Sequence, residues 1–141
     1  MKGAANKERG AFPWPDPPFH IALVEPEIPP NTGNIARLCA ATGTTLHLVG
    51  QLGFRLSDKS LKRAGLDYWD SVQMVRHATF EAFKASLAAC RFFFFSARGQ
   101  RLYTSVTYQP GDVLVFGGER TGLPDEILKA HGNCVLTVPM R

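Results

Sequence analysis

Two short runs in the second half of the chain contain only apolar residues, Phe92–Phe95 and Val113–Phe116. Both are far shorter than the roughly 18 residues that a membrane-spanning helix needs. A strand with one solvent-facing side would alternate apolar with polar residues, and these runs do not. Continuous apolar runs are typical of central strands in a parallel sheet, because helices cover both faces of such a sheet. The runs therefore predict an α/β fold.

The segments around these runs alternate between strand-like and helix-like patterns. Strands are predicted at 20–24, 46–49, 71–75, 92–97, 113–116 and 134–138, and helices at 34–41, 58–64, 79–89 and 124–130. Gly43 and Gly65 are expected to end the first two helices, and Asp58 to begin the second. Strands that alternate with helices at this spacing imply crossover connections. We therefore expect a mainly parallel sheet with helices on both faces.

The first 18 residues differ in composition from the rest of the chain. Four prolines surround Trp14, and proline at this density disrupts helices and sheet ladders alike. A length of 141 residues suits one core. We therefore expect a Pro-rich tail over residues 1–18 and a single domain over residues 19–141.

The charge and composition of the chain limit its surroundings and partners. Lys and Arg number 16 and Asp and Glu 12, which gives a net charge of +4 and suits a partner that carries phosphates. No apolar run could span a bilayer, and the N-terminus has no signal-peptide pattern. The four histidines and three cysteines lack metal-ligand spacing. We expect a cytoplasmic protein without membrane contact and without a metal.

The loop after the first predicted strand, residues 25–37, has the sequence EPEIPPNTGNIAR. Ligands bind at the carboxyl ends of strands in open α/β sheets, so this is a candidate site. Its two adjacent prolines are expected to hold it extended, and Asn31 and Thr32 to cap the helix that follows. Asn34 and Arg37 are three residues apart and would share a helix face. The alternative is a capped helix with one solvated arginine.

The loop after the strand 113–116 has the sequence GGERTGLPDE. Gly117 and Gly118 would leave room for a ligand against the main chain. Glu119 could accept hydrogen bonds from a ribose or orient an arginine. The alternative is a Gly-rich turn that leads into a helix.

A third region, around the predicted helix 58–64, mixes cationic and aromatic side chains. Such a patch could hold RNA phosphates and stack a base. The alternative is the solvated face of an amphipathic helix. The residues that we expect to bind substrate here are Arg55, Lys59, Lys62, Arg63 and Tyr68.

Several common motifs are absent from the sequence. It contains no G-x-G-x-x-G, Walker A, H-E-x-x-H or G-x-S-x-G pattern. Rossmann dinucleotide binding, P-loop chemistry and the common hydrolase mechanisms therefore lose support.

Three separated stretches, IALVEPEIPPNTGNIARLCAATGTTLHLVG, LKRAGLDYW and FGGERTGLPDEIL, followed by VPM, occur in this order. Together they resemble the small single-domain SPOUT (SpoU-type) tRNA 2′-O-methyltransferases, from about Phe19 to Met140. The resemblance implies a trefoil-knotted α/β fold, S-adenosylmethionine as the methyl donor and the wobble nucleotide of tRNA as the target. It also implies a homodimer with its sites at the subunit interface.

The resemblance also assigns roles to individual residues. The first family motif matches Asn31, Asn34 and Arg37, and the second matches Gly117, Glu119 and Gly122. It implies catalytic roles for Arg37, which would act on the ribose 2′-hydroxyl, for Asn34 and for Glu119, and a substrate-binding role for Asn31. Phe95, Gly117 and Val138 fall where the family lines its cofactor pocket. We expect a branched side chain at position 117 to occupy ligand space.

The chain departs from the family pattern at its end, Arg141, where the family continues with a third motif and a further helix. We expect one wall of the cofactor pocket, part of the dimer contact and the segment that completes the knot to be missing from this chain. A non-catalytic RNA-binding module is the alternative function. It would use the same basic surface without needing the 117–122 loop.

Overall fold

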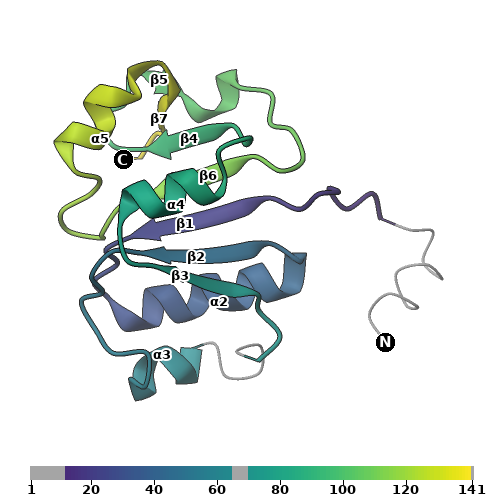
Figure 1. Ribbon diagram of the computed structural model, residues 1–141, viewed down its shortest axis with the longest axis vertical. Coiled ribbons are helices and arrows are strands. Elements are labelled where there is room, and N and C mark those ends of the chain that lie inside the picture. Colours follow the sequence, from purple (N-terminus) through teal and green to yellow (C-terminus); the bar gives the residue numbers. More distant parts are fainter. Residues whose placement is uncertain (1–11, 65–69, 141) are drawn as a thin grey trace.

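The computed structural model describes residues 12–64 and 70–140, and strands in these ranges form one seven-stranded sheet (Figure 1). The order is β3-β2-β1-β6-β4-β7-β5, and each pair of neighbouring strands is parallel. The mainly parallel α/β class is therefore confirmed. The strands are β1 (His20–Val24), β2 (Thr45–Val49), β3 (Met74–His77), β4 (Phe92–Phe95), β5 (Arg101–Leu102), β6 (Val113–Phe116) and β7 (Val135–Thr137).

Helices cover both faces of the sheet, as expected. On one face, α2 (Pro29–Thr42) packs against α3 (Lys59–Ala64) and, through Ala36 and Cys39, against alternate residues of β1 and β2. On the other face lie α4 (Phe80–Ser86) and α5 (Asp125–Ala130), with Phe83 and Ile127 in the second core cluster. Both apolar runs take central places in the sheet, and Val113, Val115 and Phe94 are fully buried.

The start of α2 differs from the prediction. Pro29 and Pro30 are its first helical residues, whereas we expected them to hold an extended loop. Proline is accepted in the first turn because its missing N–H has no helical partner there. Asn31 and Thr32 therefore lie inside the helix, and the residue before it, Ile28, has no capping side chain.

The other helix ends follow the sequence more closely. Gly43 ends α2 in the left-handed region at φ 73°, as predicted. The Asp58 carboxylate accepts hydrogen bonds from the backbone N–H groups of Ser60 and Leu61, which confirms Asp58 as the start of α3. Gly65, predicted to end α3, lies outside the described residues. The helix predicted at 79–89 is α4, which ends at Ser86.

Two strand predictions were incomplete. The strand placed at 71–75 lies at 74–77, and the two-residue strand β5 was not predicted. Short 3-10 helices at Tyr103–Ser105 and Gly132–Cys134 were also missed. Arg101 and Leu102 of β5 are both exposed, so they lack the apolar pattern that identifies a buried strand.

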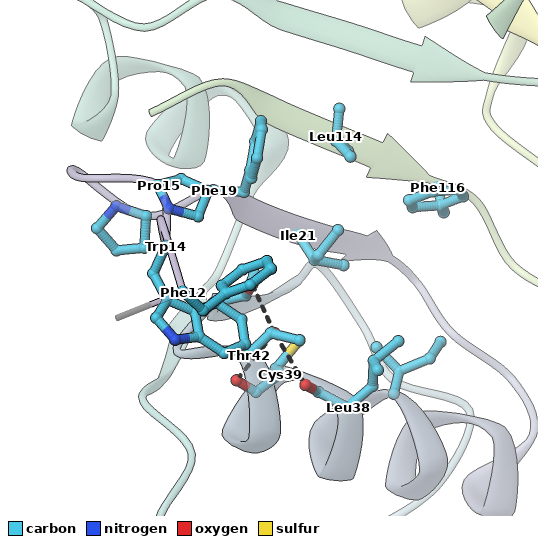
Figure 2. Close-up of a pocket in the computed structure, with 13 residues that line it drawn as sticks. Phe12, Trp14, Pro15, Phe19, Ile21, Leu38, Cys39, Thr42, Leu114 and Phe116 are labelled. Carbon is cyan, nitrogen blue, oxygen red and sulfur yellow. Dashed lines mark hydrogen bonds between the residues drawn. The ribbon is translucent and has the colours of Figure 1, made fainter. Parts of the chain in front are cut away.

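A cavity of about 620 Å³ lies beside α2 on its face of the sheet (Figure 2). Leu114 and Phe116 of β6 line it on one side and Leu38 of α2 on the other, and Phe12 and Trp14 lie at one end. Nearly all its lining is apolar, so it lacks the polar groups that would fix the orientation of a ligand.

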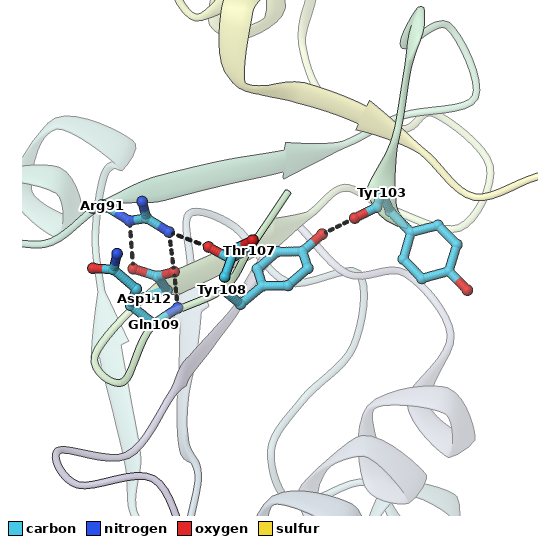
Figure 3. Close-up of polar contacts among 6 residues, drawn as sticks. All are labelled: Arg91, Tyr103, Thr107, Tyr108, Gln109 and Asp112. Atoms are coloured by element: carbon cyan, nitrogen blue, oxygen red, sulfur yellow. Dashed lines mark hydrogen bonds and ion pairs between the residues drawn. The ribbon is translucent and has the colours of Figure 1, made fainter. Parts of the chain in front are cut away.

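An ion pair fixes the amino ends of β4 and β6 (Figure 3). Arg91 donates through Nε and Nη2 to the two oxygens of Asp112, at 3.0 and 2.8 Å, and through Nη2 also to the Thr107 carbonyl. Asp112 is 2% exposed and also accepts from the Gln109 backbone N–H. Because these residues lie at the edge opposite to the strand carboxyl ends, we assign them a structural role.

Three histidines form a hydrogen-bonded chain across β1, β2 and β3. His47 lies between His20 and His77, with nitrogen-to-nitrogen distances of 2.9 Å on each side. Burial, followed by the charges of the two neighbouring histidines, lowers the pKa of His47 from 6.5 to about 4. His47 is 3% exposed and packs on the Phe83 ring. The folded protein therefore holds His47 neutral down to about pH 4.

We expect the stability of the protein to fall as the pH is lowered from 6.5 towards 4. Between pH 6.5 and about 4, His47 binds a proton in the unfolded chain but not in the folded protein. The full contribution is thus present above pH 6.5, and about 2 kcal/mol of it is lost at pH 5. Urea unfolding at pH 7.5, 6 and 5 measures this loss. The His47→Gln variant should lose this part of the pH dependence, and an unchanged slope in that variant would contradict the assignment.

Candidate functional site

The two motif loops leave neighbouring parallel strands at the same edge of the sheet. β1 leads to α2 and β6 leads to α5, and β1 and β6 pair from His20 with Val113 to Leu23 with Phe116. From β1 the chain continues outward through β2 to β3, whereas β4, β5 and β7 lie on the far side of β6. Ligands bind at such a change of direction in α/β sheets. The predicted loops therefore meet at a suitable place for a site.

Glu119 ties the second loop to the first. Its carboxylate accepts hydrogen bonds from the backbone N–H groups of Glu27 at 2.8 Å and Ile28 at 3.1 Å, and from Asn31 Nδ2 at 3.3 Å. A negative charge at a helix N-terminus is favourable, so Glu119 does for α2 what a local capping residue would do. Partial burial alone would raise the pKa of Glu119, but the backbone donors, Glu27 foremost, and the Asn31 amide lower it overall.

Glu27 returns the same kind of contact, and the sequence analysis missed it. Its Oε1 accepts hydrogen bonds from the backbone N–H groups of Arg120 at 2.7 Å and Thr121 at 3.3 Å. Each of the two carboxylates thus accepts hydrogen bonds from backbone N–H groups of the other loop. The sequence did show a second acidic residue, Glu27, in the first motif loop. It gave no sign of the partners of Glu27, because they are backbone groups more than 90 residues away.

The glycines of the second loop are required by the loop itself. A Cβ at Gly117 would lie 2.1 Å from the carbonyl carbon of Gly122 and 2.3 Å from the Leu123 nitrogen. A Cβ at Gly118 would lie 2.7 Å from Glu27 Oε1. The expectation that a side chain at position 117 would enter ligand space is therefore wrong in its reason, because the space next to Gly117 is filled by backbone.

Three candidate cofactor residues lie at the ends of neighbouring strands. Phe95 ends β4, Gly117 follows β6, and Val138 follows β7. The rings of Phe95 and Phe116 stack at 4.7 Å between centroids. Val138 is 43% exposed. The arrangement offers an apolar surface beside a glycine-rich backbone at the sheet edge.

The remaining residues of the first motif lie along α2. Asn34 and Arg37 are both exposed and three residues apart, so they share a helix face as predicted. Arg37 lies six residues after Asn31, about 9 Å further along the helix axis.

The structure places only part of the predicted basic patch. Arg55, Lys59 and Arg63 are exposed on α3 or just before it. The Lys62 side chain and Tyr68 lie outside the described residues. The loop that leads to α3 contacts the site, because the Gly53 N–H donates to the Pro26 carbonyl at 2.9 Å. The segment that carries the described cations therefore packs next to the first motif loop.

Two negative findings concern the described residues. None of their helices is long and apolar enough to cross a membrane. Within the same ranges, no group of three or more His, Cys, Asp or Glu side chains could hold a metal ion.

Comparison with known proteins gives consistent matches. The model of the SpoU rRNA Methylase family matches residues 18–141. A tRNA (cytidine(34)-2′-O)-methyltransferase of Methylovorus glucosotrophus is 56% identical over 109 residues, 77% of this chain and 71% of the relative. One of the same name from Saccharophagus degradans is 50% identical over 123 residues, 86% of this chain and 80% of the relative.

Comparison with solved structures gives matches to the same kind of protein. A structure concerned with the 2-OH methylation of C/U34 on tRNA has a TM-score of 0.82 and 48% identity, and covers 86% of this chain and 80% of its own. The AdoMet-bound rRNA methyltransferase of Sinorhizobium meliloti has a TM-score of 0.75 and 25% identity over 87% of this chain and 48% of its own. With the two motif loops joined at the carboxyl edge of a parallel sheet, these matches show that the chain belongs to the SpoU methylase family.

Proposed function

We propose that this protein transfers a methyl group from S-adenosylmethionine to the ribose 2′-hydroxyl of the wobble nucleotide, position 34, of tRNA. The observation that carries the proposal is the direct contact between the two motif loops through Asn31 and Glu119. This contact occurs in a chain that is 56% identical to a relative named for this reaction.

The residues at the strand ends fit the cofactor. S-adenosylmethionine supplies an electrophilic methyl group on a sulfonium, so the reaction needs no metal. Phe95 and Val138 would contact the apolar parts of the cofactor. The backbone after Gly117 would supply the polar contacts, because a glycine-rich loop lets a ligand approach the main chain. These residues hold and orient the donor, and alignment is a large part of such catalysis.

Arg37, Asn34 and Glu119 are the proposed catalytic residues. Arginine stays protonated in proteins, so we assign Arg37 to a substrate phosphate and to the 2′-oxygen rather than to proton removal. Asn34 shares its helix face and would hold the same nucleotide. Glu119 fixes the position of the first turn of α2, because it accepts hydrogen bonds from the backbone just before that helix. Asn31 keeps its amide oxygen for the substrate, because its Nδ2 donates to Glu119.

The basic patch would bind tRNA phosphates along the surface next to the site. Its proposed members are Arg55, Lys59, Lys62 and Arg63, with Tyr68 as a stacking residue. Replacing Arg55, Lys59 and Arg63 together by alanine should weaken tRNA binding. It should also make the plot of log affinity against log salt less steep by about 2 to 3 units of slope. Each phosphate contact displaces counterions from the RNA, so binding with three fewer contacts displaces fewer of them. An unchanged slope, measured by fluorescence anisotropy, would contradict this role.

The quaternary structure and cellular setting are further proposals. We propose a cytoplasmic protein with a SPOUT domain over residues 19–141 and a Pro-rich tail over residues 1–18. The homodimer and the trefoil knot are proposed for a chain that includes the third family motif. Leu38 on α2 is 63% exposed, and an apolar side chain on the helix that carries Arg37 suits a subunit contact. Sedimentation equilibrium that gives a monomer mass at micromolar concentration would contradict the dimer.

The function is tested with labelled S-adenosylmethionine and two tRNA transcripts, one with a ribose and one with a 2′-deoxyribose at position 34. We expect label only in the first, recovered as a 2′-O-methylated nucleoside. Label on a base, or equal label in both transcripts, would contradict the proposal. A protein that binds tRNA in a salt-dependent way but gives no heat with S-adenosylmethionine in calorimetry would favour the non-catalytic RNA-binding module.

A further inference from the structure

Glu27 belongs to the first motif loop, and the family motifs assign it no role. One oxygen of its carboxylate, Oε1, accepts hydrogen bonds from two consecutive backbone N–H groups, those of Arg120 and Thr121. These groups follow Glu119 directly. Glu27 therefore fixes the part of the second motif loop that lies between Glu119 and Gly122.

The surroundings leave Glu27 little freedom to move away from this contact. Its backbone N–H donates to Glu119 at 2.8 Å. On the other side, a Cβ at Gly53 would lie 3.0 Å from the Glu27 Cα, so the loop before α3 packs closely against the Glu27 backbone. Gly118 leaves the space that the Glu27 carboxylate occupies. Two separate segments, the second motif loop and the loop before α3, thus pack closely around Glu27.

The geometry of the second loop depends on this contact. The Gly122 N–H donates to the Gly118 carbonyl at 2.8 Å, which closes a tight turn with Arg120 and Thr121 at its tip. Arg120 and Thr121 are exposed, so packing alone does not hold the tip. Among the described residues, the Glu27 carboxylate joins the backbone of Arg120 and Thr121 to the first loop.

We infer that Glu27 is a positioning residue: its carboxylate holds the backbone of Arg120 and Thr121, and thereby presents Glu119 and Gly122 to donor and tRNA. The inference rests on the proposed function for its kinetic part. Its structural part stands on the contacts alone.

Variants Glu27→Ala and Glu27→Gln test the inference. The alanine variant should lose the protection of the Arg120 and Thr121 amides from hydrogen exchange, and its kcat should fall roughly 10- to 100-fold, as expected for misplaced groups. Its affinity for tRNA should stay within about twofold. The glutamine variant keeps an oxygen that accepts both N–H groups, so it should recover most of the protection and of kcat.

The control is Glu81→Ala, which removes an exposed carboxylate from α4 on the opposite face of the sheet. It should match the unchanged protein in both readouts, and circular dichroism melts verify that every variant is folded at the assay temperature. Wild-type exchange at Arg120 and Thr121 in Glu27→Ala, or a glutamine variant as impaired as the alanine variant, would overturn the inference. Because hydrogen exchange needs no substrate, it tests the contact even if methyl transfer to tRNA fails.

Discussion

Replacing Gly117 by alanine is expected to abolish S-adenosylmethionine binding and methyl transfer and to lower the free energy of unfolding by about 3 kcal/mol. The added Cβ would lie 2.1 Å from the Gly122 carbonyl carbon and 2.3 Å from the Leu123 nitrogen. Both atoms belong to the backbone, so no side-chain rotation relieves the overlap. The loop must open, which separates Glu119 from its partners in the first loop. Isothermal calorimetry and urea unfolding measure the two effects.

Two other glycines serve as controls for this variant. A Cβ at Gly132 has nothing within 4 Å, so Gly132→Ala should change stability by less than about 0.5 kcal/mol. Gly122 also has open space, but its φ of 67° is unfavourable for alanine, so Gly122→Ala should cost about 1 kcal/mol. A Gly117→Ala protein with the affinity and stability of Gly132→Ala would contradict the assignment of Gly117 to the turn.

Replacing Arg37 by alanine should reduce the single-turnover rate of methyl transfer by at least about 100-fold, because catalysis by alignment is lost when a positioning cation is removed. The affinity for S-adenosylmethionine should stay within about twofold, since the proposed partner of Arg37 is the RNA. Arg37→Lys should recover only part of the rate, because a lysine keeps the charge but not the planar pair of donors. Quenched-flow kinetics with calorimetry separates the two effects.

The matched control is Lys84→Ala, which removes a cation from α4 on the opposite face of the sheet. Its rate and cofactor affinity should equal those of the unchanged protein. If Arg37→Ala weakened cofactor binding as strongly as it slowed methyl transfer, the division between an RNA-binding Arg37 and a cofactor-binding Gly117 loop would be wrong.

The parts of the fold that the sequence predicted are those with a local physical cause. Phe92–Phe95 and Val113–Phe116 were recognised because strands buried on both faces must be apolar throughout. Gly43 was recognised because a left-handed helix end favours glycine. β5 was missed because two exposed residues carry no pattern and gain their strand geometry only from pairing with β7.

The candidate site shows the same division. Sequence placed Asn31 and Glu119 at the carboxyl edge, and the structure joins them directly. It gave no sign that Glu119 caps α2 or that Glu27 holds the second loop. In each case a carboxylate meets backbone N–H groups, and every residue except proline has such a group. The prediction that Asn31 and Thr32 cap α2 was wrong because α2 begins at Pro29, which places both residues inside the helix, and Glu119 of a distant loop caps it instead.

The position of β1 between β2 and β6 has a consequence for how the chain acquires its structure during synthesis. The β1 residue His20 pairs with Thr45 on one side and with Val113 on the other, so its two neighbours are about 25 and 93 residues away along the chain. Contacts of short sequence separation form sooner than distant ones. The half of the sheet that contains β1, β2 and β3 can therefore assemble while β6 is still unmade, leaving one edge of β1 open until the ribosome has released the last third of the chain. Catalytic competence would appear only after that edge closes, because the two motif loops meet only when β6 lies beside β1.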